Sequence, residues 1–213
     1  MSGITRRRVM EVALAGKAAG GELRQSKRDV NPQLFTFVGG KVGDWSVVEM
    51  KAVVGNSLGA TERLAVVHGD VSSLPDGSKW ALRGVTSNVR YVTRAEIELL
   101  NSQQADLGRP QATCAALIPI RKTAEWWSMP QDERRRIFEE GSHHVKTGLQ
   151  YLPAIARRLH HCRDLGDTEP FDFLTWFDYA PEHAEAFEEL VGLLRATEEW
   201  NFVEREVDIR LAR

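Results

Sequence analysis

Cysteine is scarce in this chain of 213 residues, which contains only Cys114 and Cys162. Two cysteines cannot form the set of disulfides that stabilises small secreted domains, and their spacing is not that of a metal site. We therefore expect two buried thiols in a reducing compartment.

Long apolar runs and a strong net charge are also missing. Hydrophobic residues make up 42% of the chain and charged residues 27%, which is ordinary for a soluble globular protein. No apolar run approaches the length of a membrane span, so we expect no membrane partner. The formal net charge is -2, so the composition gives no support for a nucleic-acid partner. The length suits one large domain or two small ones.

The basic charge is concentrated at the start of the chain. Residues 1–28 carry seven lysines and arginines against two glutamates, a local charge of +5. Three arginines followed by small apolar residues are reminiscent of a twin-arginine export signal, but Glu11 interrupts that stretch and Lys17 follows it. We expect residues 1–30 to form a basic tail on a cytoplasmic protein, with periplasmic export as the alternative.

Glycines divide residues 31–110 into short pieces. Residues 36–55 are typical of two short strands around glycine-rich turns. A third strand is predicted from Trp80 to Tyr91, leading into a helix from about Thr93. We interpret this region as a shortened ferredoxin-like half.

Residues 111–213 show a clearer pattern. Ser128, followed by Pro130 and Gln131, predicts the N-cap and first turn of a helix that carries Ile137, Phe138, Val145 and Leu149 on one stripe. The full series of predicted elements is a buried strand (112–122), that helix, a strand (155–165), a strand (171–180), a helix (181–200) and a strand (203–212). The order β-α-β-β-α-β predicts an α+β, ferredoxin-like domain, with an antiparallel sheet covered on one face by helices.

His144 is the first candidate for chemistry. Counted helically from Ile137, the buried stripe passes through Gly141, His144 and Gly148, whereas neighbouring His143 lies about 100° away. Glycine in a helix costs roughly 1 kcal/mol relative to alanine, so two glycines beside His144 suggest room for a bulky group. His144 is either a ligand or a core histidine with its hydrogen bonds satisfied.

Arg157 is the second candidate, thirteen residues after His144. In a strand, alternation places Arg157 between Ile155 and Leu159 on one face, with Arg158 and His160 on the other. An arginine between aliphatic residues must pair with a buried anion or line a pocket. A salt bridge to Glu199 or Asp178 is the alternative to a pocket. One imidazole with one guanidinium suits haem iron better than zinc, which takes more protein ligands.

Three further features favour a cofactor site. Lys122 ends a predicted strand, and Trp126 and Trp127 follow it together. Indole N–H groups can bond a carboxylate, although tryptophans also serve as core anchors. Glu199 is predicted at the C-terminus of the last helix, where the dipole disfavours an anion, so a partner such as a ligating imidazole would explain it.

The segments IPIRKTAEWWSM, ERRRIFEEGSHHVKTGLQYLPAIARRLHHCRDLG, FDFLTWFDYAPEHAEAFEELVGLLRATEEW and VEREVDIRLAR resemble the chlorite dismutase family, specifically its short-chain, dimeric branch. The resemblance covers roughly residues 35–213. It implies a dimeric α+β barrel of ferredoxin-like halves, with haem b bound in the half formed by residues 111–213.

The resemblance also implies roles for individual residues. His144 is similar to the family's proximal haem ligand, and Arg157 to its distal catalytic arginine. Other expected cofactor contacts are Lys122 and Glu199 around the histidine, the tryptophans Trp126 and Trp127, Ile118, and Arg90 with Tyr91.

The implied reaction decomposes chlorite to chloride and dioxygen. Haem would take an oxygen atom from chlorite to give a ferryl species, and Arg157 would hold the transient hypochlorite while the O–O bond forms. The alternatives are a coproheme decarboxylase of haem biosynthesis, whose family pattern differs before the basic strand end and commonly lacks the arginine, and a haem carrier or sensor. The expected partners are chlorite and a second copy of the chain.

Overall fold

The computed structural model describes residues 31–71, 73–87 and 90–213. The predicted basic tail, residues 1–30, lies outside this range. Among the described residues, no helix combines the length and apolarity needed to cross a bilayer.

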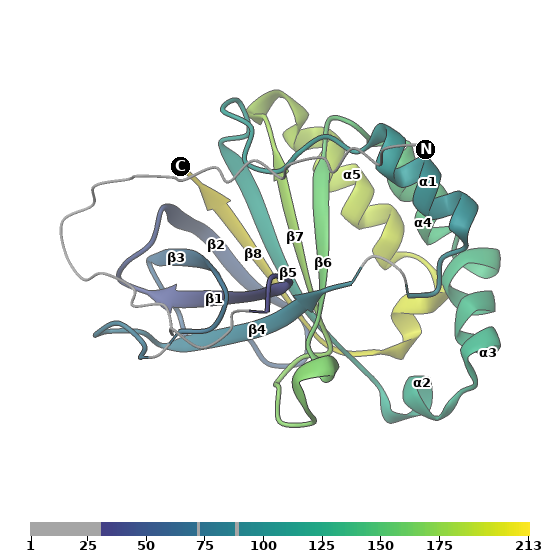
Figure 1. Cartoon of the computed structure of the whole chain (residues 1–213), viewed down its shortest axis with the longest axis horizontal. Coiled ribbons are helices and arrows are strands. Elements are labelled where there is room, and N and C mark those ends of the chain that lie inside the picture. Colours follow the sequence, from purple (N-terminus) through teal and green to yellow (C-terminus); the bar gives the residue numbers. More distant parts are fainter. Residues whose placement is uncertain (1–30, 72, 88–89) are drawn as a thin grey trace, which may run out of the picture.

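Eight antiparallel strands in the described ranges close into one barrel (Figure 1). Around the barrel they follow the order β1-β3-β2-β8-β5-β7-β6-β4. Their bounds are β1 (Leu34–Gly40), β2 (Trp45–Val54), β3 (Arg63–His68), β4 (Trp80–Thr86), β5 (Cys114–Lys122), β6 (Ala156–His161), β7 (Phe173–Tyr179) and β8 (Val203–Ala212). The two halves of the chain share this barrel, because β8 pairs with β2 and β6 pairs with β4.

The C-terminal half confirms the predicted β-α-β-β-α-β order. Its strands lie in the order β8-β5-β7-β6, and Figure 1 shows the helices gathered on one side of the barrel. The strand β5 reads as one apolar run because both its faces are buried. Ala115 and Leu117 point into the barrel core, whereas Ala116, Ile118 and Ile120 pack toward α5 (Ala184–Arg195).

The apolar stripe predicted for the last helix is confirmed in α5, which buries Phe187, Leu190, Val191 and Leu194. The helix is shorter than predicted, because it ends at Arg195 and a separate 3₁₀ turn, η4 (Glu198–Phe202), follows. The predicted position of Glu199 at a helix C-terminus is therefore wrong, since Glu199 lies near the start of η4.

The N-terminal half has one strand more than predicted. The missed strand is β3, a short segment whose Val66 is 39% exposed while Val67 is buried. The predicted strand from Trp80 ends at Thr86 rather than at Tyr91. The helix after it is confirmed: α1 (Arg94–Gln103) begins at the N-cap Thr93. A close approach explains Gly39, because a Cβ there would lie 2.2 Å from the Trp80 ring.

The helix predicted from Ser128 through Leu149 is interrupted. Ser128 is the last residue of α2 (Ala124–Ser128) rather than an N-cap, and Pro130 occupies the N-cap of α3 (Gln131–Arg135). A π-helical turn, η1 (Arg136–Gly141), continues α3, and α4 (His144–Leu149) starts anew after it. The break lies at His143, whose φ of 53° is left-handed and cannot continue a right-handed helix.

Candidate functional site

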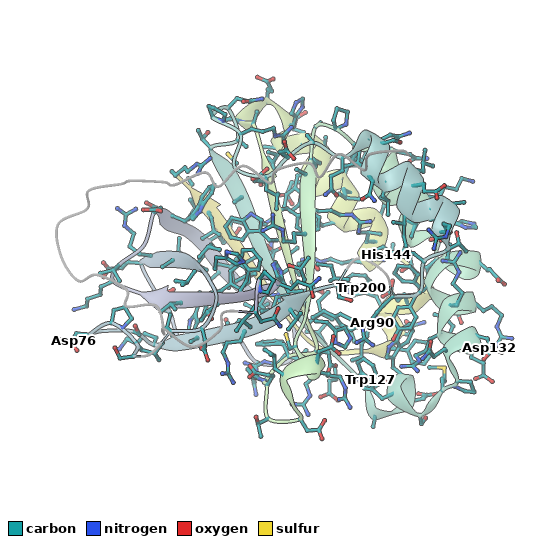
Figure 2. All side chains as sticks on the ribbon, viewed as in Figure 1. Asp76, Arg90, Trp127, Asp132, His144 and Trp200 are labelled. Atoms are coloured by element: carbon teal, nitrogen blue, oxygen red, sulfur yellow. The ribbon has the colours of Figure 1, made fainter. Side chains whose placement is uncertain are left out.

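A large pocket lies between the outer face of β5, β6 and β7 and the helices α1, α4 and α5. It holds about 1370 Å³ of empty space, part of which is open to solvent. Figure 2 shows His144, Trp200 and Arg90 in this region, between the barrel wall and the helices. Its walls are mainly apolar, as expected for a site that binds a large hydrophobic ligand.

The pocket brings together most of the residues predicted from the sequence. Lining residues include the two candidates for chemistry and six of the expected cofactor contacts: His144, Arg157, Ile118, Lys122, Trp126, Glu199, Arg90 and Tyr91. Trp127 does not line it. Its indole N–H donates to Asp172 Oδ2 at 3.0 Å, and its ring stacks on Phe173.

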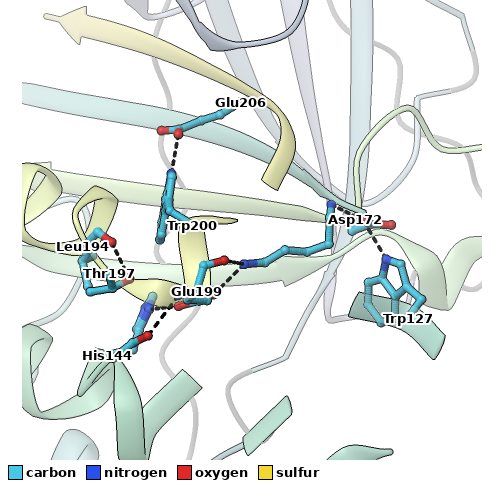
Figure 3. Close-up of polar contacts among 10 residues, drawn as sticks. Trp127, His144, Asp172, Leu194, Thr197, Glu199, Trp200 and Glu206 are labelled. Atoms are coloured by element: carbon cyan, nitrogen blue, oxygen red, sulfur yellow. Dashed lines mark hydrogen bonds and ion pairs between the residues drawn. The ribbon is translucent and has the colours of Figure 1, made fainter. Parts of the chain in front are cut away.

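Glu199 bonds both His144 and Lys122 in the wall of the pocket, and Figure 3 shows the contact between Glu199 and His144. His144 Nδ1 lies 2.8 Å from Glu199 Oε2, and Lys122 Nζ lies 2.8 Å from Glu199 Oε1. An ionised carboxylate only accepts hydrogen bonds, so Nδ1 carries the proton and donates it. Nε2 of His144 makes no hydrogen bond to any described residue, which leaves its lone pair for a ligand.

The Glu199 carboxylate is held in its charged form. Burial alone would raise its pKa, because only 5% of the residue is exposed, but the positive charge of Lys122 and the contact with His144 outweigh burial and lower the pKa to about 2. Lys122 is also buried, with its ammonium 4.6 Å from the centre of the Trp126 ring. The carboxylate is therefore an anionic acceptor that holds the imidazole ring in one orientation through Nδ1.

The start of α4 positions His144. Glu139 accepts hydrogen bonds from the backbone N–H groups of Val145 at 2.6 Å and Lys146 at 3.3 Å, so its side chain caps the helix. Ser142 Oγ accepts from the Glu199 backbone N–H at 3.1 Å and ties η4 to this turn.

The inward orientation of His144 agrees with the sequence prediction, but for a different reason. His143 is exposed, whereas the His144 side chain is 17% exposed and its ring stacks on Phe138. The predicted continuous stripe is wrong, because Gly141 is exposed and His143 breaks the helix.

We expect Glu139→Ala to destabilise the protein by about 1–2 kcal/mol, because the first turn of α4 loses its cap. Denaturant unfolding of the apoprotein measures this change. Glu140→Ala is the matched control, since Glu140 is exposed and caps no helix; it should stay within about 0.5 kcal/mol of the parent. Equal stability of the two variants would contradict the capping role.

Arg157 projects from β6 into the pocket and has no carboxylate partner among the residues that the structure describes. The predicted alternative of a salt bridge is wrong for both candidates, because Glu199 pairs with Lys122 and His144 while Asp178 pairs with Arg109. Burial lowers the pKa of the Arg157 guanidinium below its ordinary value, and the charge of Glu139 opposes this effect. Arginine remains charged in proteins, so the pocket contains a cation with no anion bound to it from the described residues.

Gly148 lies beside the guanidinium of Arg157. Gly148 is buried in α4, and a Cβ there would lie 3.7 Å from Arg157 Cζ, which is an ordinary van der Waals contact. The guanidinium lies next to the α4 backbone at Gly148, which is one helical turn after His144. The predicted strand alternation is confirmed, since Leu159 also lines the pocket while Arg158 lies over the Phe35 ring on the opposite face.

Sequence reasoning missed a second set of polar residues at this site. Trp200 Nε1 donates to Glu206 Oε2 at 2.7 Å, and Glu206 Oε1 accepts from Arg195. The β8 sequence places Glu206 and Asp208 on the face opposite its apolar residues, a pattern normally typical of a solvated face. Here α5 covers that face, and both acids are completely buried.

Comparison with known proteins places these features in a family. The family model described as chlorite dismutase matches residues 26–213. A chlorite dismutase from Ideonella dechloratans is 29% identical over 100 residues, which is 46% of this chain but only 33% of that relative's length.

Solved structures share the barrel. The dimeric chlorite dismutase structure from Nitrobacter winogradskyi is 62% identical, with a TM-score of 0.76 over 84% of this chain and 99% of that one. The chlorite dismutase from Candidatus Nitrospira defluvii in complex with imidazole is 19% identical, with a TM-score of 0.61 over 86% of this chain and 92% of that one, and shows the fold alone. The match of the family model over most of the chain, on the same barrel, establishes that this chain belongs to the chlorite dismutase family.

Proposed function

We propose that this protein binds haem b in the pocket and decomposes chlorite to chloride and dioxygen. The observation that carries the proposal is the pairing, in one apolar pocket, of a carboxylate-bonded imidazole with an unpaired guanidinium. Membership of the chlorite dismutase family supports it.

The residues present fit a haem. The pocket is large and mainly apolar, and His144, with Glu199 bonded to its Nδ1, would supply the imidazole that holds the iron. Ile118 and Trp126 would contact the macrocycle. Arg90 lines the same pocket, and we propose that it and Tyr91 lie close to the bound cofactor.

When bound, haem would supply the redox chemistry that breaks a Cl–O bond. Overall, ClO₂⁻ gives Cl⁻ and O₂, so the oxygen atoms balance and no proton is consumed. A general acid or base is therefore unnecessary, and the chain must instead bind an anion and keep its fragments together. Arg157 suits this role, because its fixed charge and several N–H donors can hold chlorite and then hypochlorite until the O–O bond forms.

Glu199 and Lys122 would act on the iron through His144, because Glu199 bonds both the imidazole and the ammonium. A carboxylate that accepts the Nδ1 proton raises the basicity of the imidazole and stabilises oxidised iron. The buried ammonium of Lys122 keeps that carboxylate charged. We also propose a homodimer, since the Nitrobacter winogradskyi relative is described as dimeric.

The test is oxygen release from chlorite by the purified, haem-loaded protein in an oxygen electrode. We expect one O₂ for each chlorite consumed, and a Soret band that titrates to one haem per chain. Loss of carboxylate groups from added coproheme when hydrogen peroxide is supplied as the two-electron oxidant, without O₂ release from chlorite, would favour the decarboxylase. Stable haem binding with neither reaction would favour a carrier or sensor.

A further inference from the structure

Trp200 lines the pocket next to Lys122, although no sequence pattern predicts a role for it. Its ring centre lies 5.5 Å from Lys122 Nζ, and the Trp126 ring centre lies 4.6 Å from the same nitrogen. We propose that Trp200 is a positioning residue: with Trp126 it forms a cation–π enclosure around Lys122 that keeps Glu199 aligned with His144. The inference rests on the proposed function only in treating His144 as the cofactor ligand.

Lys122 needs this enclosure because its ammonium is buried and short of acceptors. The side chain is 3% exposed, and Nζ carries three N–H donors. Glu199 supplies two acceptors, its Oε1 at 2.8 Å and its backbone carbonyl at 3.3 Å. The indole faces compensate for the remaining donor, because a cation–π contact is stronger when the cation is removed from water.

Glu199 transmits the position of Lys122 to His144. Each carboxylate oxygen has one role: Oε1 bonds Lys122, and Oε2 bonds His144 Nδ1. If the ammonium shifted, Oε1 would lose its buried partner and the carboxylate could rotate away from the imidazole. The hydrogen bond to His144 therefore depends on whatever immobilises Lys122.

Trp200 is itself immobilised from two other elements. Its indole N–H donates to Glu206 Oε2 at 2.7 Å, as Figure 3 shows. The other oxygen of Glu206 accepts from Arg195 Nε at 2.9 Å and Nη2 at 2.5 Å, and Arg195 also bonds Asp208 at 2.7 Å. The orientation of the indole ring is thus fixed by residues of α5 and β8, so the Trp200 side chain cannot easily adopt another conformation.

The experiment compares Trp200→Leu, which removes the π face, with Trp200→Phe, which keeps one. Trp80→Leu is the control, because Trp80 is buried at a distant point of the barrel and contacts Gly39. The first readout is the imidazole ¹⁵N spectrum of the apoprotein, which reports the His144 Nδ1–H bond. The second is the rate of haem transfer to an excess of a haem scavenger.

We expect Trp200→Leu to weaken the Nδ1–H signature and to raise the rate of haem loss on the order of 10-fold. Trp200→Phe should change both much less, and Trp80→Leu should change neither. In a Lys122→Gln background, which keeps a donor near Glu199 but no cation, Trp200→Leu should add almost nothing. Glu206→Gln should loosen the indole and give a smaller effect in the same direction.

Equal effects of Trp200→Leu with and without Lys122 would overturn the proposal, since they would show that Trp200 acts only by packing. An unchanged His144 signal in Trp200→Leu would also overturn it. The apoprotein spectrum needs no haem, so it decides the inference even if the proposed function fails.

Discussion

His144→Ala is expected to lose haem almost completely. The imidazole is the only iron ligand that we propose, so its removal should lower the affinity for haem by more than the 10- to 100-fold that follows loss of a hydrogen-bonding partner of a ligand. Titration of haem into the apoprotein, followed by the Soret band, measures the change. Added imidazole should restore part of the binding, because the substitution leaves a cavity beside the intact Glu199–Lys122 pair.

His143→Ala provides the control, since His143 is exposed and directed away from the pocket. It should bind haem as the parent does, with at most a small loss of stability from the contact between its Nδ1 and the Glu139 carbonyl. Loss of haem in His143→Ala and retention in His144→Ala would reverse the assignment of the ligand.

Arg157→Ala should still bind haem, but it should turn over chlorite more slowly and release hypochlorite. Charged hydrogen bonds contribute about 1.5–3 kcal/mol, so initial kcat/KM for chlorite should fall on the order of 10- to 100-fold. Hypochlorite that is no longer held should escape, chlorinate a reporter dye, and bleach the cofactor within fewer turnovers. Oxygen yield per chlorite, dye chlorination and Soret decay are recorded in one assay.

Two variants make this result specific. Arg157→Lys keeps the charge but not the planar donor fork, so it should fall between the parent and Arg157→Ala. Arg158→Ala removes the neighbouring cation on the opposite face, over Phe35, and should react as the parent does. Unchanged turnover and durability in Arg157→Ala would remove the arginine from the proposed mechanism.

The C-terminal half was predictable because its signals are local and strong. The β5 run, the α5 stripe and the β8 alternation each follow from a single periodicity, and they predict which segments of this half are strands and which are helices. Alternation in β6 was enough to direct Arg157 to the same side as Leu159. Periodicity therefore identifies Arg157 as a pocket residue, whereas the expected cofactor contacts of Ile118, Arg90 and Tyr91 rest on the family resemblance alone.

The remaining features depend on contacts that no local pattern records. The interruption at His143 depends on the Glu139 side chain, which replaces a helical continuation with a new cap. Glu206 is buried because α5 covers its face of β8, and a charged alternation alone predicts solvent there. The short strand β3 was missed because its exposed Val66 lies beside buried residues, so it lacks a clean pattern.

Because the barrel is closed by pairing between the two halves, neither half has a complete sheet of its own. The outer strands of the C-terminal sheet, β8 and β6, pair with β2 and β4 of the other half. Separation of the halves would leave two rows of backbone N–H and C=O groups without partners, and such rows readily recruit strands from other molecules. The N-terminal half therefore covers both edges of the C-terminal sheet, in addition to supplying α1 and the segment before it to the wall of the pocket.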